Sequence, residues 1–272
     1  MYKDFIEDRI NVFLEEFEKL VVKENIPVTD FLYKECDYKL DNNLPEIDDS
    51  FTLFTPYINR WGGKKDKHAW FYNEIEVPLY WDGEIQLAVA SDARLGWCDI
   101  NPQFIAFVDG KLQQGIDKNH REVFLTKGSH KVYLYAYSGS IHDEYVDFVT
   151  NLQLIDAKTK QLYYDIKVPF EILEFEDQNS KNYFEIKKHL NNALNFIDMR
   201  SPYSEEYYAS LDKAIDYLKT EFYGKYCRQG EVFAFCIGHT HIDVAWEWTL
   251  AQTREKILRS FSTVLALMKK YP

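Results

Sequence analysis

The sequence has 272 residues, with 32 basic and 44 acidic side chains and a formal net charge of −12. This length is sufficient for one large domain or two ordinary ones. Apolar residues make up 46% of the chain and aromatic residues 17%, which excludes a disordered or low-complexity protein. The acidic balance and the absence of a Lys/Arg block argue against binding to nucleic acid or anionic lipid. We expect a neutral substrate, a protein partner or a metal.

Neither an export signal nor a membrane span is predicted. The amino terminus is charged where a signal peptide would need an apolar core, and no run of about 18 apolar residues occurs. The cysteines are far apart and form no Cys-x-x-Cys pair, so reduced thiols are expected rather than two disulfides. They are Cys36, Cys98, Cys227 and Cys236. These features predict a cytoplasmic protein that binds no membrane.

An amphipathic helix is predicted at the amino terminus. Apolar residues recur at steps of three and four from Lys3 to Glu24, and the segment 25–27 ends the pattern with a proline. We expect this helix to pack against its own domain, although its narrow apolar stripe could also pair with another chain.

Short aromatic and β-branched runs with a period of two follow between Phe51 and Val168. Turn signals separate them, which predicts an antiparallel, jelly-roll-like β-sandwich. The run from Lys131 to Tyr137 places three tyrosines on one side, to be covered by a neighbouring element or to bind a flat ligand. The predicted strands are 70–77, 84–90, 103–108, 122–125, 130–137, 146–155 and 161–168.

A helical period returns after Pro169 and predicts two antiparallel helices, at about 186–197 and 207–222. Ser204 is a candidate cap at the start of the second helix, and Gly224 is a candidate stop at its end. With the sandwich, these helices predict an α+β fold.

The last part of the sequence is predicted to be a buried strand at 231–237, a polar loop with His239, His241 and Asp243, and a helix at 250–268. Ligands in such strand–loop–helix units lie at the carboxyl end of the strand. In an extended loop, residues two apart project to the same side, so an imidazole and a carboxylate can converge on one cation. These donors suit zinc. A hydrogen-bonded histidine at the helix start is the alternative on spacing alone.

The stretch Gly238 to Trp246, Gly-His-Thr-His-Ile-Asp-Val-Ala-Trp, resembles the start of the catalytic domain of the glycoside hydrolase family 38 α-mannosidases, in particular their cytosolic, metal-dependent branch. Residues 254–272 continue this likeness. Three upstream segments, 61–63, 108–110 and 115–123, resemble the amino-terminal β-sandwich of that branch. Within the last of these segments, Asp117 and His120 are expected to be turn residues.

The resemblance implies a retaining exo-glycosidase that removes terminal α-linked mannose from oligosaccharides by a double displacement, with a divalent metal, usually zinc, beneath the terminal sugar. On the family's pattern, His241 and Asp243 match metal ligands, and Trp246 matches the ring on which the mannose stacks. His239 matches no ligand. Glu247 departs from the family, which usually has an apolar residue after that tryptophan.

No residue of this sequence matches the family's nucleophile or general acid, which are expected beyond Pro272. We therefore expect the front part of an enzyme, without glycosidase activity of its own and with at most weak affinity for a metal, because only two of the family's ligands are present. The resemblance divides the sequence into an amino-terminal helix at 1–30, a β-sandwich domain at 31–175, a helical linker at 176–228 and the truncated start of an α/β catalytic domain at 229–272.

Two other classes of function stay open. In a metal-dependent amidohydrolase, His239 and His241 would both be ligands and Asp243 would be dispensable. In a non-catalytic module, the sandwich would bind carbohydrate through the tyrosine row and three tryptophans. We expect the sandwich instead to support the catalytic domain and to mediate contacts in a homo-oligomer. The tryptophans are Trp61, Trp70 and Trp81.

Overall fold

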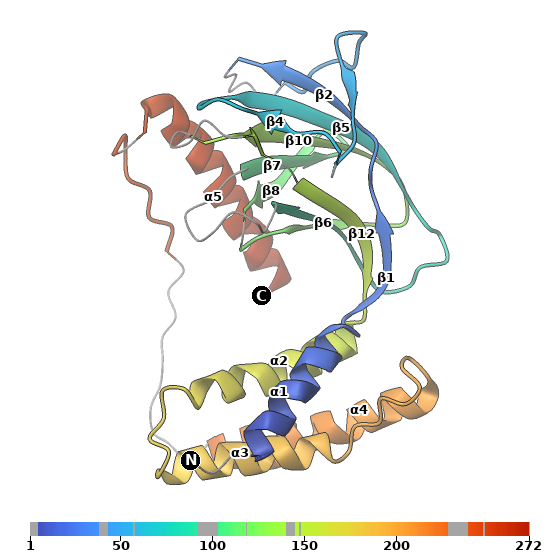
Figure 1. Cartoon of the computed structure of the whole chain (residues 1–272), viewed down its shortest axis with the longest axis vertical. Coiled ribbons are helices and arrows are strands. Elements are labelled where there is room, and N and C mark those ends of the chain that lie inside the picture. Colours follow the sequence, from blue (N-terminus) through green and yellow to red (C-terminus); the bar gives the residue numbers. More distant parts are fainter. Residues whose placement is uncertain are drawn as a thin grey trace. The chain divides into compact units, whose positions relative to one another are not determined.

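The computed structural model consists of two compact units, which are described separately (Figure 1). The first comprises residues 1–24 and 154–236, and the second comprises residues 25–153 and 237–272. Among the described residues, no helix combines the length and the apolar character that a membrane crossing requires. The structure describes residues 5–37, 43–56, 58–91, 103–117, 119–139, 145–146, 148–227, 239–246 and 248–271.

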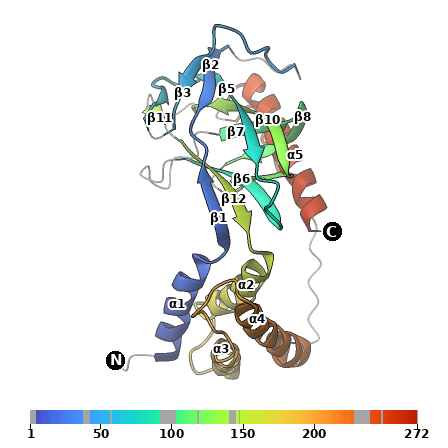
Figure 2. The same ribbon diagram turned by 90° about the vertical axis from the view of Figure 1, so that its right-hand side faces the viewer.

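The first unit is a bundle of helices around one apolar core (Figure 2). Its helices are α1 (Phe5–Glu18), α2 (Ala157–Ile172), α3 (Lys181–Leu194), α4 (Glu205–Tyr217) and the π-helix η1 (Leu218–Tyr226). Each of them contributes nearly inaccessible side chains, among them Ile10, Phe17, Leu162, Ile166, Leu190, Leu211 and Phe222. The amino-terminal helix therefore packs within its own unit, as expected.

The predicted amino-terminal helix is too long at its carboxyl end. Helix α1 ends at Glu18, and strand β1 (Val22–Pro27) pairs with β12 (Phe148–Ile155). The backbone carbonyl of Val21 accepts a hydrogen bond of 2.9 Å from the N–H of Asp156, next to this pairing. Backbone bonds to a neighbouring strand replace those of a further helical turn here, where the chain carries two β-branched residues in succession.

The strand predicted at 161–168 is wrong, because this segment lies inside α2. The side chain of Asp156 accepts a hydrogen bond of 2.8 Å from the N–H of Thr159 and caps the helix. Buried residues then follow at helical steps, at Thr159, Leu162, Tyr163 and Ile166. A short aromatic run is compatible with both periods, and here the cap and the common core select the helix.

The two helices predicted after this segment correspond to α3 and α4. Ser204 caps α4, since its Oγ accepts a hydrogen bond of 3.1 Å from the N–H of Tyr207. The predicted stop at Gly224 is wrong, because Gly224 lies within η1. A Cβ at this position would lie 2.5 Å from the carbonyl oxygen of Lys219, so the missing side chain permits the π-helical turn.

The second unit contains the β-sheets. The strands are β1 and β12, given above, with β2 (Phe31–Cys36), β3 (Thr52–Phe54), β4 (Trp61–Gly62), β5 (His68–Val77), β6 (Glu84–Ser91), β7 (Gln103–Val108), β8 (Lys111–Ile116), β9 (Glu122–Leu125), β10 (Gly128–Tyr137) and β11 (Tyr145–Val146). They form a six-stranded sheet in the order β3-β2-β5-β10-β7-β8, a four-stranded sheet in the order β1-β12-β6-β9, and a β11-β4 pair. Strand β5 pairs antiparallel with β2 and β10, β10 with β7, β7 with β8, and β6 with β9.

The two larger sheets pack face to face through aromatic rings. Phe148 of β12 is fully buried, and its ring centroid lies 5.8 Å from that of Phe31, 4.9 Å from that of Phe71 and 5.2 Å from that of Phe104. The last three residues belong to the six-stranded sheet. The α+β fold with antiparallel sheets is as predicted, whereas the jelly-roll connectivity and the four-part division of the chain stay predictions.

Three tryptophans of this unit lie in its interior. Trp61 and Trp81 are each 2% exposed and Trp70 is 8% exposed. A sugar needs an accessible indole face to stack on. These residues therefore stabilise the sandwich and do not offer a carbohydrate-binding surface.

Helix α5 (Leu250–Lys270) lies against the sheet and contacts Tyr135 and Tyr137, two of the three tyrosines in the row (Figure 1). A neighbouring element thus covers this part of the row, which is one of the two outcomes expected. Tyr135 is buried, and its hydroxyl donates a hydrogen bond of 3.0 Å to Glu255 of the helix. The helix comes very close to the sheet at Gly115 of β8, where a Cβ would lie 2.7 Å from the Cβ of Arg259. A glycine inside a strand is a usual mark of such close backbone approach.

Some predictions fall outside the described residues. These are the strand at 231–237 and the residues Cys98, Cys236 and Glu247. The other two cysteines, Cys36 and Cys227, have free thiols.

Candidate functional site

The candidate site lies on the loop of residues 239–246, which precedes α5. The helix begins with a capping box: Thr249 Oγ1 accepts a hydrogen bond of 3.2 Å from the N–H of Gln252, and the Gln252 side chain accepts one of 2.8 Å from the N–H of Thr249. Ala245 has a φ of 56°, in the left-handed region that residues other than glycine rarely adopt. The loop thus changes direction sharply between Asp243 and Trp246.

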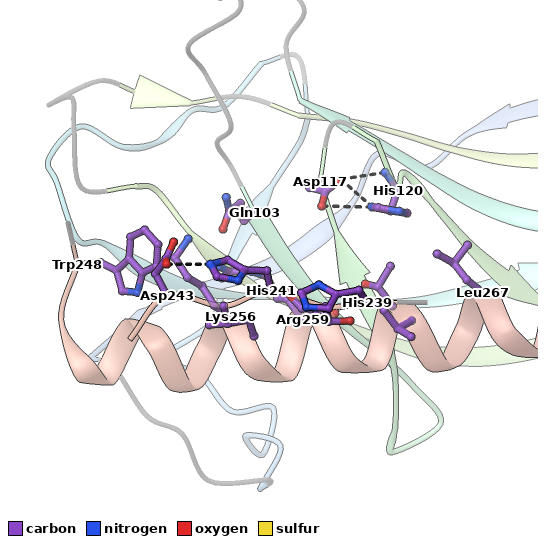
Figure 3. A pocket seen from close by; sticks show the side chains of 15 residues that line it. Gln103, Asp117, His120, His239, His241, Asp243, Trp248, Lys256, Arg259 and Leu267 are labelled. Carbon is purple, nitrogen blue, oxygen red and sulfur yellow. Dashed lines mark hydrogen bonds and ion pairs between the residues drawn. The ribbon is translucent and has the colours of Figure 1, made fainter. Parts of the chain in front are cut away.

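His241 and Asp243 come together, as the spacing of two predicted. The distance between His241 Nε2 and Asp243 Oδ1 is 2.9 Å, and the side chains are 72% and 42% exposed (Figure 3). Because both are accessible from solvent, a ligand that bridges the nitrogen and the oxygen need not enter the protein interior.

The donor set of this pair fits part of a metal site. One imidazole nitrogen and one carboxylate oxygen are ligands that zinc accepts, and they already lie on one side of the loop. Within the described ranges, no group of three or more His, Cys, Asp or Glu residues is arranged to hold a metal ion. The pair could therefore supply two ligands.

His239 lies beside this pair in a different arrangement. Its ring stacks on that of His241 with an interplanar angle of 15° and a centroid distance of 6.2 Å. The closest approach of His241 to a carboxylate is to Asp243, at 2.9 Å. The geometry thus joins His241 to Asp243 more closely than to His239.

Trp246 and Trp248 differ in exposure. Trp246 is 71% exposed, as a ring that stacks on a ligand from solvent must be. Trp248 is partly buried: Lys256 Nζ lies 4.1 Å from its ring centroid, and its Nε1 donates a hydrogen bond of 3.1 Å to Thr253. The two ring centroids are 6.3 Å apart. Trp248 is thus fixed by its neighbours, whereas Trp246 presents its ring to solvent.

A pocket of about 430 Å³ opens beside the loop (Figure 3). The loop contributes one wall and α5 another, and the turn after β8 contributes Asp117 and His120. The polar residues that line it include Gln103, Asp117, His120, His239, His241, Asp243, Lys256 and Arg259. A polar pocket of this kind suits a hydroxyl-rich ligand.

Asp117 and His120 are turn residues, as predicted. Asp117 Oδ1 accepts hydrogen bonds from the N–H of Asn119 at 2.8 Å and of His120 at 2.9 Å, and it lies 3.1 Å from His120 Nδ1. Their position in the wall of the pocket was not predicted, because no periodic pattern relates residues near 120 to those near 240.

A second polar group lies beneath α5 and was also missed. We call His68, Tyr135, Glu255 and Arg259 the buried cluster. The Tyr135 hydroxyl lies 3.0 Å from Glu255 Oε1 and 2.9 Å from His68 Nδ1, and Arg259 Nη1 lies 3.8 Å from Glu255 Oε2. The tyrosine row is the sequence signal that could have predicted the buried cluster. A buried tyrosine hydroxyl needs a hydrogen-bond partner, so the element that covers the row had to supply polar side chains.

Burial controls protonation in this cluster. It raises the pKa of Glu255 to about 7, although the Arg259 guanidinium opposes the rise. It lowers the pKa of His68 to about 4. In neutral solution His68 is therefore uncharged, and Glu255 is near its midpoint.

The carboxyl-terminal segment matches a known family. Residues 231–272 match the family described as "Glycosyl hydrolases family 38 N-terminal domain". The chain is 22% identical to "Alpha-mannosidase G" of Dictyostelium discoideum over 278 residues, which is 95% of this chain and 24% of that relative. It is 27% identical to "Alpha-mannosidase 2C1" of Mus musculus over 223 residues, which is 74% of this chain and 20% of that relative. The chain thus spans about a quarter or less of the length of these relatives.

Among solved structures, a β-glucuronidase from Ruminococcus gnavus aligns with 48% of this chain and 30% of its own, at 9% identity and a TM-score of 0.33. Similarity at this level supports no conclusion about fold or function.

Proposed function

We propose that this chain, which is similar to the family 38 α-mannosidases, is the amino-terminal part of a metal-dependent, retaining exo-α-mannosidase that removes terminal α-linked mannose from oligosaccharides. The observation that carries the proposal is the pair of His241 and Asp243, 2.9 Å apart, on a loop that the family match covers. In that setting the two side chains would hold a divalent cation, most simply Zn²⁺.

The bound cation would supply a Lewis-acid contact for sugar hydroxyls. The residues of this chain have their own tasks in the proposal. His241 and Asp243 hold and orient the cation from one side of the loop. Trp246 offers an accessible indole face to the apolar C–H face of the sugar, since it is 71% exposed.

The amidohydrolase alternative would need His239 and His241 as joint ligands. The parallel stacking of the two rings, with centroids 6.2 Å apart, favours it less than the direct approach of His241 to Asp243. The mannosidase proposal requires Asp243 as a ligand, whereas the amidohydrolase alternative requires His239. Single variants at these two positions therefore distinguish them.

The first test is a titration of the purified 272-residue chain with Co²⁺, followed by visible absorption and calorimetry. We expect weak binding, because the pair supplies two ligands, and we expect it to weaken further in His241→Ala and in Asp243→Asn, because each variant removes a ligand. His239→Ala is the matched control and should bind as the unaltered chain does. Loss in His239→Ala with retention in Asp243→Asn would support the amidohydrolase, and absence of Co²⁺ binding by the unaltered chain would contradict the metal role.

The second test concerns catalysis. We expect the chain to release no nitrophenol from 4-nitrophenyl α-mannoside, because no residue of its sequence matches the family's nucleophile or general acid. Measurable release that scales with the concentration of purified chain would show that these groups lie within the 272 residues.

The proposal also places the protein in the cytoplasm, with an α-mannoside oligosaccharide as its partner and a homo-oligomer as its assembly. The free thiols of Cys36 and Cys227 support this location, because an oxidising compartment favours disulfides. The mass of the denatured protein in a cell extract tests the length of the full chain, and its ratio to the native mass tests the assembly.

A further inference from the structure

One hydroxyl group joins α5 to the loop that carries His241, Asp243 and Trp246. Thr253 lies in the first turns of the helix and is 4% exposed. Its Oγ1 accepts a hydrogen bond of 3.2 Å from the N–H of Ala245 and one of 3.1 Å from Nε1 of Trp248. It donates a third, of 3.2 Å, to the carbonyl of Thr249.

These three bonds use the full capacity of a hydroxyl group, which has one donor and two acceptor positions. Both acceptor positions bind groups that precede the helix: one binds the backbone N–H of Ala245, and the other binds the indole N–H of Trp248. The cap of α5 does not depend on them, because Thr249 and Gln252 form the capping box by themselves. The Thr253 side chain thus has a task beyond the helix start.

The backbone N–H that Thr253 binds belongs to Ala245, whose backbone conformation is strained. Ala245 has a φ of 56°, and a conformation of this kind persists only where the surrounding structure holds it. Ala245 stands between Asp243 and Trp246, so its turn determines how both side chains are presented. The hydrogen bond from the N–H of Ala245 to Thr253 Oγ1 stabilises this turn.

We propose that Thr253 is a positioning residue: its hydroxyl holds the turn at Ala245 and thereby sets the metal-binding geometry of His241 and Asp243 and the orientation of Trp246. This inference rests on the proposed function for the role of the loop. The contacts that define it are independent of any metal.

The test compares Thr253→Val, which keeps the shape and removes the hydroxyl, with Thr253→Ser, which keeps the hydroxyl, in the full 272-residue chain. Thr253→Cys provides a further variant of similar size with a weak acceptor, should the valine variant fail to fold. Ser262→Ala is the matched control, because Ser262 is a buried hydroxyl of the same helix and bonds to the carbonyls of Leu258 and Arg259.

The first readout is amide hydrogen exchange, measured by nuclear magnetic resonance without metal. In Thr253→Val the Ala245 amide should exchange faster, and the Trp248 indole N–H should shift, whereas both stay unchanged in Thr253→Ser and in Ser262→Ala. The second readout is Co²⁺ affinity, which should fall about 10-fold to 100-fold in Thr253→Val, as for other groups that orient metal ligands, and recover in Thr253→Ser.

Unchanged exchange of the Ala245 amide in Thr253→Val would overturn the inference. So would a Co²⁺ affinity that falls equally in Thr253→Val and Ser262→Ala, because the effect would then be one of general stability. If the unaltered chain binds no Co²⁺, the metal role under the proposed function fails, and the exchange data still decide whether Thr253 holds the loop.

Discussion

Two of the histidine–carboxylate pairs in the second unit differ widely in burial. His68 and Glu255 approach to 3.4 Å with side chains 7% and 1% exposed, whereas His241 and Asp243 approach to 2.9 Å with side chains 72% and 42% exposed. Burial disfavours charge, so the first pair is pushed toward its neutral forms and serves to fasten α5 to the sheet. The second pair stays accessible to a cation. An imidazole and a carboxylate thus stabilise the fold in one place and are accessible for binding in the other.

The largest effect on stability is expected at Gly115, where α5 and the sheet are in close contact. In Gly115→Val the new side chain would collide with the backbone of Arg259, whose Cα would lie 2.9 Å from the added Cβ. Overpacking against a backbone that cannot move away should lower the free energy of unfolding by about 3 kcal/mol. Urea denaturation measures it. Gln113→Val, at an exposed position of the same strand, should leave stability nearly unchanged. A similar loss there would point to the strand rather than to the close contact with the helix.

The pH dependence of the buried pair gives the next effect. Because the folded pKa of Glu255 is raised from 4.5 to about 7, its contribution is complete below about pH 4.5 and is lost as the pH rises through 7. The variant Glu255→Gln lacks this titrating group and so does not lose stability in this way. The difference in the free energy of unfolding, variant minus unaltered chain, should therefore increase by roughly 3 kcal/mol between pH 4.5 and pH 8.

His68 acts in the opposite direction. Its folded pKa is lowered from 6.5 to about 4, so its contribution is present above pH 6.5 and is lost as the pH falls toward 4. In the unaltered chain the two effects offset each other between about pH 4.5 and 6.5, and Glu255→Gln should expose the histidine effect as stability that rises with pH. Glu76→Gln, an exposed change on β5, is the control. A pH profile of Glu255→Gln parallel to that of the unaltered chain would contradict the assignment.

A smaller effect is expected from the bridging hydroxyl. Tyr135→Phe removes the donor to Glu255 and the contact to His68, which should cost about 1–3 kcal/mol because polar atoms are left buried. Thermal unfolding measures it, with Tyr80→Phe as the exposed control, since Tyr80 is 82% exposed. Equal stability of the two variants would mean that the buried cluster does not depend on this hydroxyl.

The exposed pair should contribute least to stability. Without metal, His241→Ala should change the free energy of unfolding by less than about 0.5 kcal/mol, as is usual for surface substitutions. Asp243→Asn should behave in the same way. The measurement is the urea transition with a chelator present. A loss comparable to that of Tyr135→Phe would show that the pair is part of the fold and would weaken its assignment as a cation site.

The sequence was most informative where residues act at short range. The spacing of His241 and Asp243 predicted their approach, and Ser204 predicted the start of α4, because each depends on two to three residues. The period of two predicted β5, β7 and β10, which are half of the six-stranded sheet, but it did not predict β2, β3 or β8. The polar strand β8 was missed, because its residues carry no alternating apolar pattern.

Long-range contacts were beyond the sequence. His68, Tyr135 and Glu255 meet only after two strands and a helix are placed together, and no local pattern relates them. The segment 161–168 shows a related difficulty, since its aromatic residues fit a strand until the helical core and the Asp156 cap are known. The turn at Ala245 was also hidden, because alanine does not signal a positive φ.

The unequal exposure of the tryptophans has an optical consequence. Trp61 and Trp81 are shielded from a collisional quencher such as acrylamide, whereas Trp246 is open to it. The part of the fluorescence that the quencher removes therefore includes the emission of Trp246, so this residue can be observed without an attached dye. A sugar that stacks on this ring would protect it, so the binding step can be followed by the light that the quencher fails to extinguish.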